Sequence, residues 1–174
     1  MKVVYITMAN SQRGQTILRS TALVVAILCV AAPASAQSIQ LTGPDGSQRL
    51  VAAAALATLP HEMVTITDHT KQATFSGASL RALASLAGAP EGEALRGPAL
   101  SMVVVVTAAD GYRVALSLAE IDPGIGGRKA ILADSAAQTP LDAHQGPFRL
   151  VVDGDKRPVR SARNVVSVAV KTVN

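Results

Sequence analysis

The stretch SMVVVVTAADGYRVALSLAEI, residues 101–121, contains two strand patterns joined by a turn signal. Its run of valines predicts a buried strand over 101–107. Asp110-Gly111 is a typical hairpin turn. YRVAL, residues 112–116, alternates between apolar and polar positions, as a half-buried strand does. The stretch therefore predicts a β-hairpin at the centre of the chain.

Strands are also predicted on both sides of this hairpin, and helices are few. Helical composition or spacing occurs in VAAAALATL (51–59) and ASLRALASLAG (78–88), and the spacing of Ser117 and Glu120 is that of a capping box for a short helical turn. Strands outnumber helices and do not alternate regularly with them. The sequence thus predicts an α+β domain that is β-rich and built on a mixed sheet, rather than a doubly wound sheet. The other predicted strands are 38–43, 63–67, 129–133, 148–152 and 165–170, and 74–77 is predicted as a short strand or a turn.

Residues 1–36 have the pattern of a signal peptide. A basic leader precedes the apolar stretch TALVVAILCVAA (21–32), which is too short to span a membrane, and small residues end the segment at Ala36. We expect cleavage after Ala36, a single domain over 37–174, a periplasmic or secreted location and no transmembrane segment in the mature chain. The length of the leader leaves Met1 and Met8 as alternative starts.

Cleavage would change the chemistry of the chain. The lone cysteine, Cys29, would leave with the leader, and bulky Leu28 before it argues against a lipid anchor there. The loss of three basic residues would leave 13 Lys and Arg against 12 Asp and Glu. A balanced charge with three aromatic residues in the mature chain argues against nucleic-acid binding, which favours a basic face and stacking aromatics. These aromatic residues are Phe75, Tyr112 and Phe148.

Catalytic and metal-binding patterns are weak. His61 and His69 would lie roughly 26 Å apart along one strand, and His144 is in a loop, so no metal site is predicted. No serine has the G-x-S-x-G pattern of a nucleophile elbow, and no catalytic residue is predicted. The glycine-rich GIGGR (124–128) lacks the Lys-Ser/Thr of a phosphate loop and is interpreted as a flexible loop. A weaker alternative is that its backbone amides, with Arg128-Lys129, bind an anion.

The segment GPFRLVVDGDKRPVRSAR, residues 146–163, is the strongest candidate for a ligand site. Lys156, Arg157, Arg160 and Arg163 follow an apolar strand and a Gly-centred turn. Arginine forks can hold a phosphate or carboxylate. The alternative is a hairpin tip whose acidic and basic side chains neutralise one another in water, and the charge pattern alone favours it. Tyr112 has two interpretations as well: a core residue, which the sequence alone favours, or a pocket hydroxyl.

Several segments together are similar to one family. LATLPHEMVTIT, TFSGASLRALASLAG, VVTAADGYRVALSLAEIDP, GPFRLVVDGDKRP and VVSVAV, in this order, resemble small exported proteins with the oxidoreductase molybdopterin-binding domain of the sulfite-oxidase superfamily. The resemblance covers nearly all of 39–173. It implies a β-rich α+β fold and a molybdenum pterin cofactor, held by a cysteine thiolate and by basic and polar loop groups. On this resemblance the candidate cofactor-binding residues are Tyr112, Lys156, Arg157 and Arg160.

The chain departs from that family at the metal ligand. Asp68-His69 stands where the thiolate is expected, and the mature chain has no cysteine. A carboxylate does not readily replace a soft thiolate on molybdenum. We therefore expect an exported, degenerate molybdopterin-binding-like domain that binds a small anionic ligand or a protein partner and has lost redox chemistry. Two alternatives remain: an active molybdopterin-dependent oxidoreductase with an unusual ligand set, and a purely structural or partner-docking periplasmic module.

Overall fold

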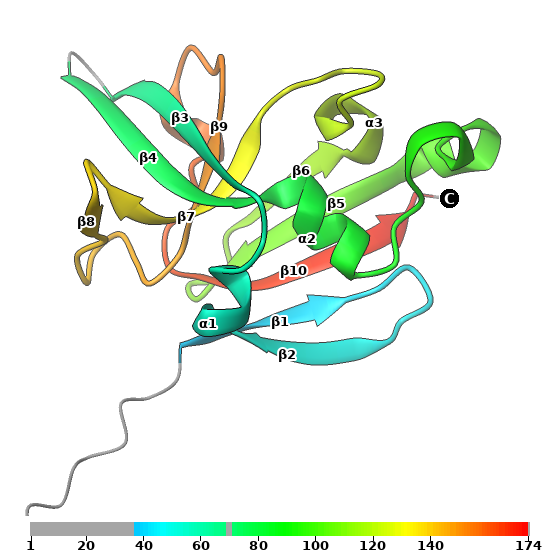
Figure 1. Cartoon of the computed structure of the whole chain (residues 1–174), viewed down its shortest axis with the longest axis horizontal. Helices are drawn as coiled ribbons and strands as arrows, with labels where there is room; N and C mark the ends of the chain where they lie inside the picture. The colour runs from blue at the N-terminus through cyan, green and yellow to red at the C-terminus, as the bar shows by residue number, and fades with distance from the viewer. Residues whose placement is uncertain (1–36, 69–70, 174) are drawn as a thin grey trace, which may run out of the picture. The chain divides into compact units, whose positions relative to one another are not determined.

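The predicted central hairpin is present in the computed structural model, which describes residues 37–68 and 71–173 (Figure 1). β5 (Met102–Ala108) and β6 (Arg113–Ser117) pair antiparallel. In the turn between them Gly111 has a φ of 85°, a left-handed conformation that glycine adopts without strain. The predicted signal peptide, with Cys29 and both alternative starts, lies outside the described residues, as does His69.

This hairpin forms one end of the first sheet, whose strand order is β2-β1-β10-β5-β6. The other strands are β1 (Ser38–Thr42), β2 (Gln48–Ala52) and β10 (Val165–Thr172). β1 runs parallel to β10, whereas the other neighbours are antiparallel. The sheet is therefore mixed, as predicted, and its parallel pair joins the two ends of the domain's sequence.

The second sheet is antiparallel and has the order β3-β4-β7-β8, with β9 also paired to β7. Its strands are β3 (His61–Asp68), β4 (Lys71–Ser79), β7 (Ala130–Ala136), β8 (Thr139–Pro140) and β9 (Arg149–Val152). β4 is much longer than the short strand predicted over 74–77, because it pairs along its length with β3 and at its end with β7.

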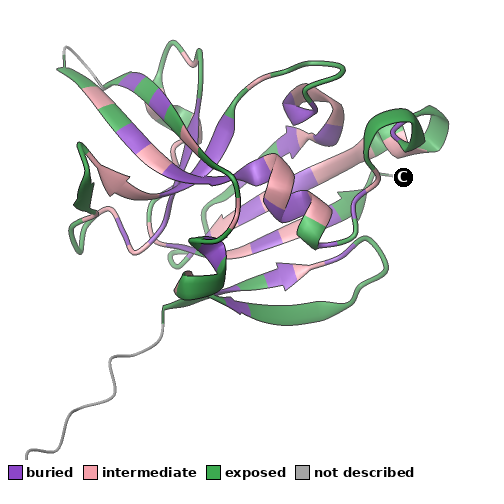
Figure 2. Cartoon of the chain, in the orientation of Figure 1, coloured by how far each residue is buried: buried purple, intermediate pink, exposed green. Residues whose placement is uncertain are grey.

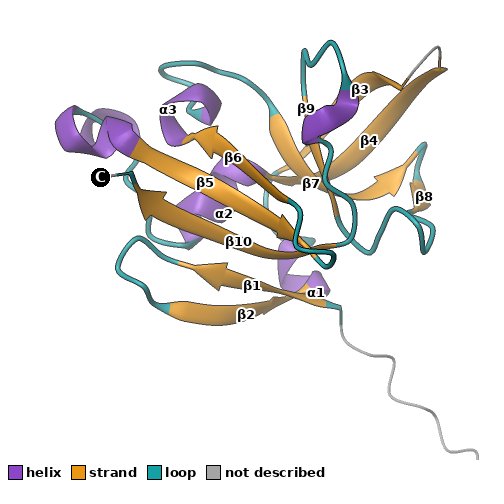
Figure 3. Cartoon of the chain, turned by 180° about the vertical axis from the view of Figure 1, so that it is seen from behind, coloured by secondary structure: helices purple, strands orange, loops and turns teal. Residues whose placement is uncertain are grey.

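Helices are short. α2 (Leu80–Leu86) contacts β7 of one sheet and β10 of the other, and lies in front of the first sheet in Figure 1 and behind it in Figure 3. The remaining helices are α1 (Ala53–Leu56), α3 (Leu118–Ile121) and three 3₁₀ turns, η1 (Gly92–Ala94), η2 (Gly97–Ser101) and η3 (Pro158–Arg160). Among the described residues, none of the helices has the length and apolar character needed to cross a membrane.

Two apolar clusters lie on opposite faces of the second sheet. The larger fills the space between the sheets and α2, where buried residues concentrate in Figure 2. The smaller lies on the opposite face of β7, so that all of 130–133 is buried. Leu132 belongs to the larger cluster and Ile131 to the smaller. The smaller cluster forms the apolar floor beside which the candidate site lies.

The α+β class is confirmed, and several local predictions need correction. The helix predicted over 51–59 is limited to α1, because Val51 and its neighbours pair with β1. The capping box is wrong, because the Ser117 side chain makes no capping hydrogen bond. The valines of β5 are buried only at alternate positions, because one face of the strand packs on the core and the other does not. The helix predicted around Leu83 forms, and Gly88 follows it with a φ of 89°.

Candidate functional site

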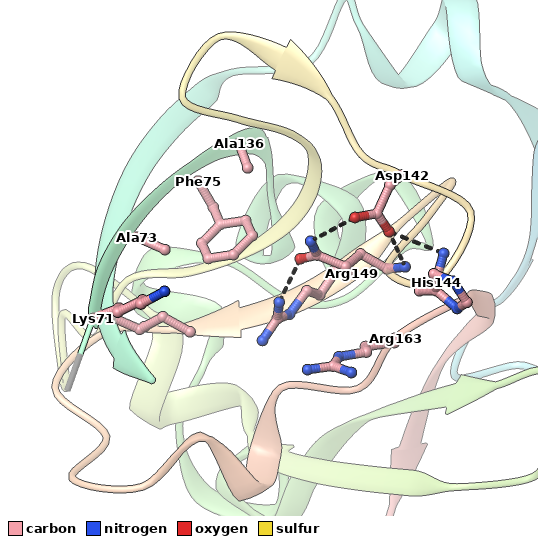
Figure 4. Close-up of a pocket in the computed structure, with 10 residues that line it drawn as sticks. Lys71, Ala73, Phe75, Ala136, Asp142, His144, Arg149 and Arg163 are labelled. Carbon is pink, nitrogen blue, oxygen red and sulfur yellow. Dashed lines mark hydrogen bonds between the residues drawn. The ribbon is translucent and has the colours of Figure 1, made fainter. Parts of the chain in front are cut away.

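A cavity of about 550 Å³ lies against the smaller apolar cluster (Figure 4). We call it the Arg149 cavity. Its walls come from β3, β4, β7 and β9, from the loop between β8 and β9, and from the segment before β10. The side chains that line it are Ile66, Lys71, Ala73, Phe75, Ala136, Asp142, His144, Gln145, Arg149 and Arg163.

Arg149 is the most deeply placed charge of this cavity, with 3% of its surface exposed. It opens β9 opposite Ala133, whose methyl group leaves room for a long neighbour. The guanidinium carbon lies 4.7 Å from the centre of the Phe75 ring, within the range of a cation–π contact. Nε donates to Ser161 Oγ at 2.8 Å and Nη1 donates to Gln145 Oε1 at 2.6 Å. Since burying a charge is costly without such bonds, they hold the guanidinium in one position.

The loop between β8 and β9 folds around Asp142. Its Oδ1 accepts hydrogen bonds from the backbone N–H groups of His144 at 2.9 Å and Gln145 at 3.0 Å. The Gln145 side-chain amide donates to Oδ2 at 3.2 Å, and chiefly because of this side chain the pKa of Asp142 lies below its usual value. Asp142 thus fixes the loop and aims the Gln145 carbonyl oxygen at Arg149.

Among the described residues that line the cavity, cations outnumber carboxylates. Lys71, Arg149 and Arg163 extend toward the same open space in Figure 4. Among the described lining residues, Asp142 is the one carboxylate against these three permanent cations. The wall beside the cations is apolar, and a low-dielectric wall strengthens the field of a nearby charge. The arrangement favours an anion that also carries an apolar part.

The predicted basic residues are in a different environment, the basic loop of residues 153–160. Lys156 and Arg157 are exposed. Arg160 donates from Nε to Asp155 at 2.9 Å and from Nη1 to Glu120 at 3.3 Å, and its pKa is raised chiefly by the hydrogen bonds to Asp155. Arg128 bonds to the same Glu120 at 2.8 Å. The basic loop therefore contains a network of paired carboxylates and guanidinium groups, and none of its three predicted residues lines the Arg149 cavity.

Tyr112, the fourth predicted residue, also lies outside the lining of the Arg149 cavity. Its side chain is not in the core: the residue is 49% exposed, and its hydroxyl donates to the carbonyl oxygen of Val159 at 2.7 Å. This bond joins the β5–β6 turn to the basic loop. Tyr112 also lines a neighbouring cavity of about 420 Å³ that shares His144 and Arg163 with the Arg149 cavity.

Sequence reasoning missed Arg149 and Lys71 as site residues. Arg149 carried one usable signal, because it is the single charge inside the apolar run FRLVV. A buried strand position occupied by arginine requires partners and is a candidate functional position. Lys71 carried no such signal, because its role depends on where β4 places it. Arg163, the fourth basic residue of the quoted segment, does line the cavity.

The glycine-rich GIGGR segment does not offer its amides to an anion. The N–H groups of Gly126 and Arg128 donate to the carbonyl oxygens of Ala119 and Glu120, and those of Ile125 and Gly127 donate to that of Asp122. The N–H group of Gly124 donates to Asp122 Oδ1. The interpretation of this segment as an anion-binding loop is therefore wrong: its amides hold the loop against α3.

Two histidines considered as metal ligands have other contacts. His61 Nδ1 lies 3.0 Å from the carbonyl oxygen of Leu59, and Nε2 lies 3.2 Å from Asp134 Oδ2. The pKa of His61 is raised, first by the Leu59 carbonyl and then by Asp134. His61 thus links β3 to β7, while His144 lines the Arg149 cavity.

A molybdenum pterin would require a soft ligand that this donor set lacks. The described groups at the cavity are ammonium, guanidinium, imidazole, amide and carboxylate groups, and the mature chain that we expect contains no cysteine. Such groups suit a phosphate or carboxylate, and they do not suit a thiolate-bound molybdenum. The site fits the anionic part of such a cofactor and not its metal.

No protein-family model matches the chain, and a search of curated proteins finds no significant match. The functional argument therefore depends on the geometry of the cavity.

Proposed function

We propose that this chain is an exported protein with a molybdopterin-binding-like domain that has lost redox chemistry and binds a small anionic ligand in the Arg149 cavity. The observation that carries the proposal is the meeting of Lys71, Arg149 and Arg163 at one cavity of about 550 Å³. Cavities of this size accommodate small organic ligands.

The Arg149 side chain is preorganised, because hydrogen bonds within the protein hold it in position without a ligand. Arg149 is held between Ser161 and Gln145, and Gln145 is in turn held by Asp142. A ligand then does not have to order this side chain, which lowers the entropic cost of binding. Guanidinium groups at fixed positions are well matched to phosphate and carboxylate oxygens.

The resemblance to the molybdopterin-binding family supports the same location. The family thiolate is expected just after the strand that VTIT resembles, and Ile66 and Lys71, on either side of that position, both line the cavity. The chain has exchanged the soft ligand at this position for hard groups. We therefore place the retained ligand site and the lost metal site at the same cavity.

Phosphate binding tests the proposal, with two arginines as a matched pair. Inorganic phosphate, compared with chloride at equal ionic strength, should raise the melting temperature of the wild-type protein. Arg163→Gln should lower phosphate affinity about tenfold, because it removes a charged contact, while Arg157→Gln should change it less than about twofold. Isothermal titration calorimetry measures both.

The two variants distinguish the Arg149 cavity from the basic loop as the place where phosphate binds. A loss of phosphate binding in Arg157→Gln with none in Arg163→Gln would assign the site to the basic loop and overturn the Arg149 cavity. If phosphate and chloride changed the melting temperature of the wild-type protein equally, the proposal of an anion site would be rejected.

Metal content tests the loss of redox chemistry separately. Protein purified from its native compartment should contain far less than one molybdenum atom per chain, measured by inductively coupled plasma mass spectrometry. One molybdenum per chain would establish the alternative, an oxidoreductase with an unusual ligand set.

A further inference from the structure

A second cavity, of about 600 Å³, lies between the start of β3, α2 and the loop that follows α3. It shares no lining residue with the Arg149 cavity. Its floor includes the apolar side chains of Ala82, Ile121 and Ala130. We call it the Ser79 cavity.

One wall of the Ser79 cavity is locked by an ion pair. Arg81 Nε donates to Asp122 Oδ2 at 3.1 Å, and their side chains are 12% and 5% exposed. The other arginine nitrogens donate to Ser85 Oγ at 3.0 Å and to the carbonyl oxygen of Pro90 at 2.8 Å. Asp122 Oδ1 accepts from the N–H group of Gly124 at 2.9 Å. These groups shape the wall, and their hydrogen bonds are already made within the protein.

Ser79 differs from these groups. It is 6% exposed and lines the cavity, yet its hydroxyl makes no hydrogen bond with any described residue. It stands at the first residue before α2 without capping it. The hydroxyl oxygen still reaches solvent in the cavity, because no fully enclosed side-chain polar atom among the described residues lacks a hydrogen-bond partner. A polar ligand in the cavity would supply the missing partner.

Charges of both signs line the same cavity as this hydroxyl. Glu62, Glu91 and Lys129 line the same cavity, and within the described part of the chain none of them forms an ion pair. The described lining of the Arg149 cavity is mostly cationic, whereas this cavity has two carboxylates and one ammonium outside any described ion pair, beside Arg128, which bonds to Glu120. The carboxylates would repel a purely anionic ligand, and Lys129 would repel a purely cationic one.

We propose that the Ser79 cavity binds a zwitterionic ligand of amino-acid or dipeptide size. The ammonium group of the ligand faces Glu62 and Glu91, its carboxylate faces Lys129, and one polar group bonds to the Ser79 hydroxyl. The apolar floor takes a small aliphatic side chain. This site is separate from the anion site and does not depend on the function proposed above.

Glycyl-L-leucine is the probe, because it carries both charges and an aliphatic side chain. By calorimetry or ligand-observed NMR on the full mature protein, it should bind with a Kd of about 1 mM or tighter. N-acetylglycyl-L-leucine lacks the ammonium and glycyl-L-leucinamide lacks the carboxylate, and each should bind at least about tenfold more weakly. Absence of glycyl-L-leucine binding up to about 10 mM would overturn the proposal, as would equal affinity for all three probes.

Variants of the chain locate the binding. Ser79→Ala should weaken glycyl-L-leucine about fivefold, since it removes one hydrogen bond, and it should leave the melting temperature nearly unchanged because that hydroxyl has no bond to lose. Lys129→Gln should weaken glycyl-L-leucine and leave glycyl-L-leucinamide unaffected. Lys171→Gln is the matched control, because Lys171 is exposed near the end of β10. Unchanged affinity in Ser79→Ala, or equal losses in Lys129→Gln and Lys171→Gln, would contradict the assignment.

Arg163→Gln separates the two sites. It should reduce phosphate binding at the Arg149 cavity and leave glycyl-L-leucine affinity unchanged. If it weakened the dipeptide as much as phosphate, the dipeptide would bind through the Arg149 cavity, and the second site would be rejected.

Discussion

The basic loop and the Arg149 cavity both contain arginines, but these arginines have different hydrogen-bond acceptors. In the basic loop, Arg160 bonds to the carboxylates of Asp155 and Glu120. In the cavity, the side chains that position Arg149 include two neutral ones, Gln145 and Ser161. A carboxylate that binds a guanidinium also cancels its charge, whereas an amide or hydroxyl oxygen only orients it. The printed hydrogen bonds of the two arginines therefore differ in the kind of acceptor, carboxylate in the basic loop and amide or hydroxyl oxygen in the cavity.

The largest expected effect comes from the buried arginine. Arg149→Ala should lower the free energy of unfolding by about 3 kcal/mol, because Gln145 and Ser161 lose a charged donor and Phe75 loses its covering group. Urea unfolding measures this value. Arg149→Lys should recover part of the stability. If Arg149→Ala lowered the free energy of unfolding no more than Arg160→Ala does, the proposed difference between the two regions would be rejected.

The next effect concerns the two other cations of the cavity. The double variant Lys71→Gln/Arg163→Gln should weaken phosphate binding about a hundredfold, because it removes two of the three cations at the site. Both residues are exposed, so the double variant leaves no cavity in the apolar core, and its melting temperature without phosphate is measured as the reference. The matched control is Lys156→Gln/Arg157→Gln, which removes the same charges from the basic loop. Equal losses in both double variants would indicate general charge attraction rather than a defined site.

A smaller effect is expected in the basic loop itself. Arg160→Ala should cost about 1 kcal/mol of folding free energy, because its partly exposed ion pairs are screened by water and because Arg128 still contacts Glu120. Thermal or urea unfolding at low and high salt checks this, since the cost should shrink as salt rises. A cost that did not depend on salt would mean that Arg160 stabilises the loop by packing and not by its charge.

The smallest effect is the pH dependence that comes from Asp142. Its folded-state pKa lies below the usual 3.8, so its contribution to stability is present above 3.8 and is lost as the pH falls through the lower folded-state value. Wild-type protein should therefore lose slightly more stability on acidification below 3.8 than Asp142→Asn does, and its phosphate affinity should fall over the same range as the loop loosens. Parallel acid-unfolding curves for the two proteins would contradict this role.

Local elements were largely predictable. The β5–β6 hairpin and α2 follow from alternation, a turn signal and helical spacing, which act over a few residues. The exceptions are instructive: 51–59 has helical composition, but Val51 gains more by pairing with Ile39 of β1. Tertiary pairing overrides a weak local preference. Which strands share a sheet, and the parallel pairing of β1 with β10, was not readable from the residues alone.

The candidate site was less predictable than the fold. Lys71 is far from Arg149 and Arg163 in the sequence, and no spacing rule connects the three residues. The charge cluster that was visible in the sequence is the one that carboxylates occupy, because Glu120 approaches Arg160 from a distant element. For Tyr112 the sequence alone favours a core position over a pocket hydroxyl, but the strand begins at Arg113 and Tyr112 is 49% exposed just before it.

By itself, the sequence determined the α+β class, the central hairpin and the abundance of short strands, because these depend on periodicities and turn residues that are local. The tertiary structure alone decided which cations line the Arg149 cavity. Pairing of β4, β7 and β9 brings Phe75 beside Arg149, and the loop after β8 supplies the oxygens that orient it. The field at a point depends on the distances between charges in space and on which of them are paired, and neither quantity is written in the order of the residues.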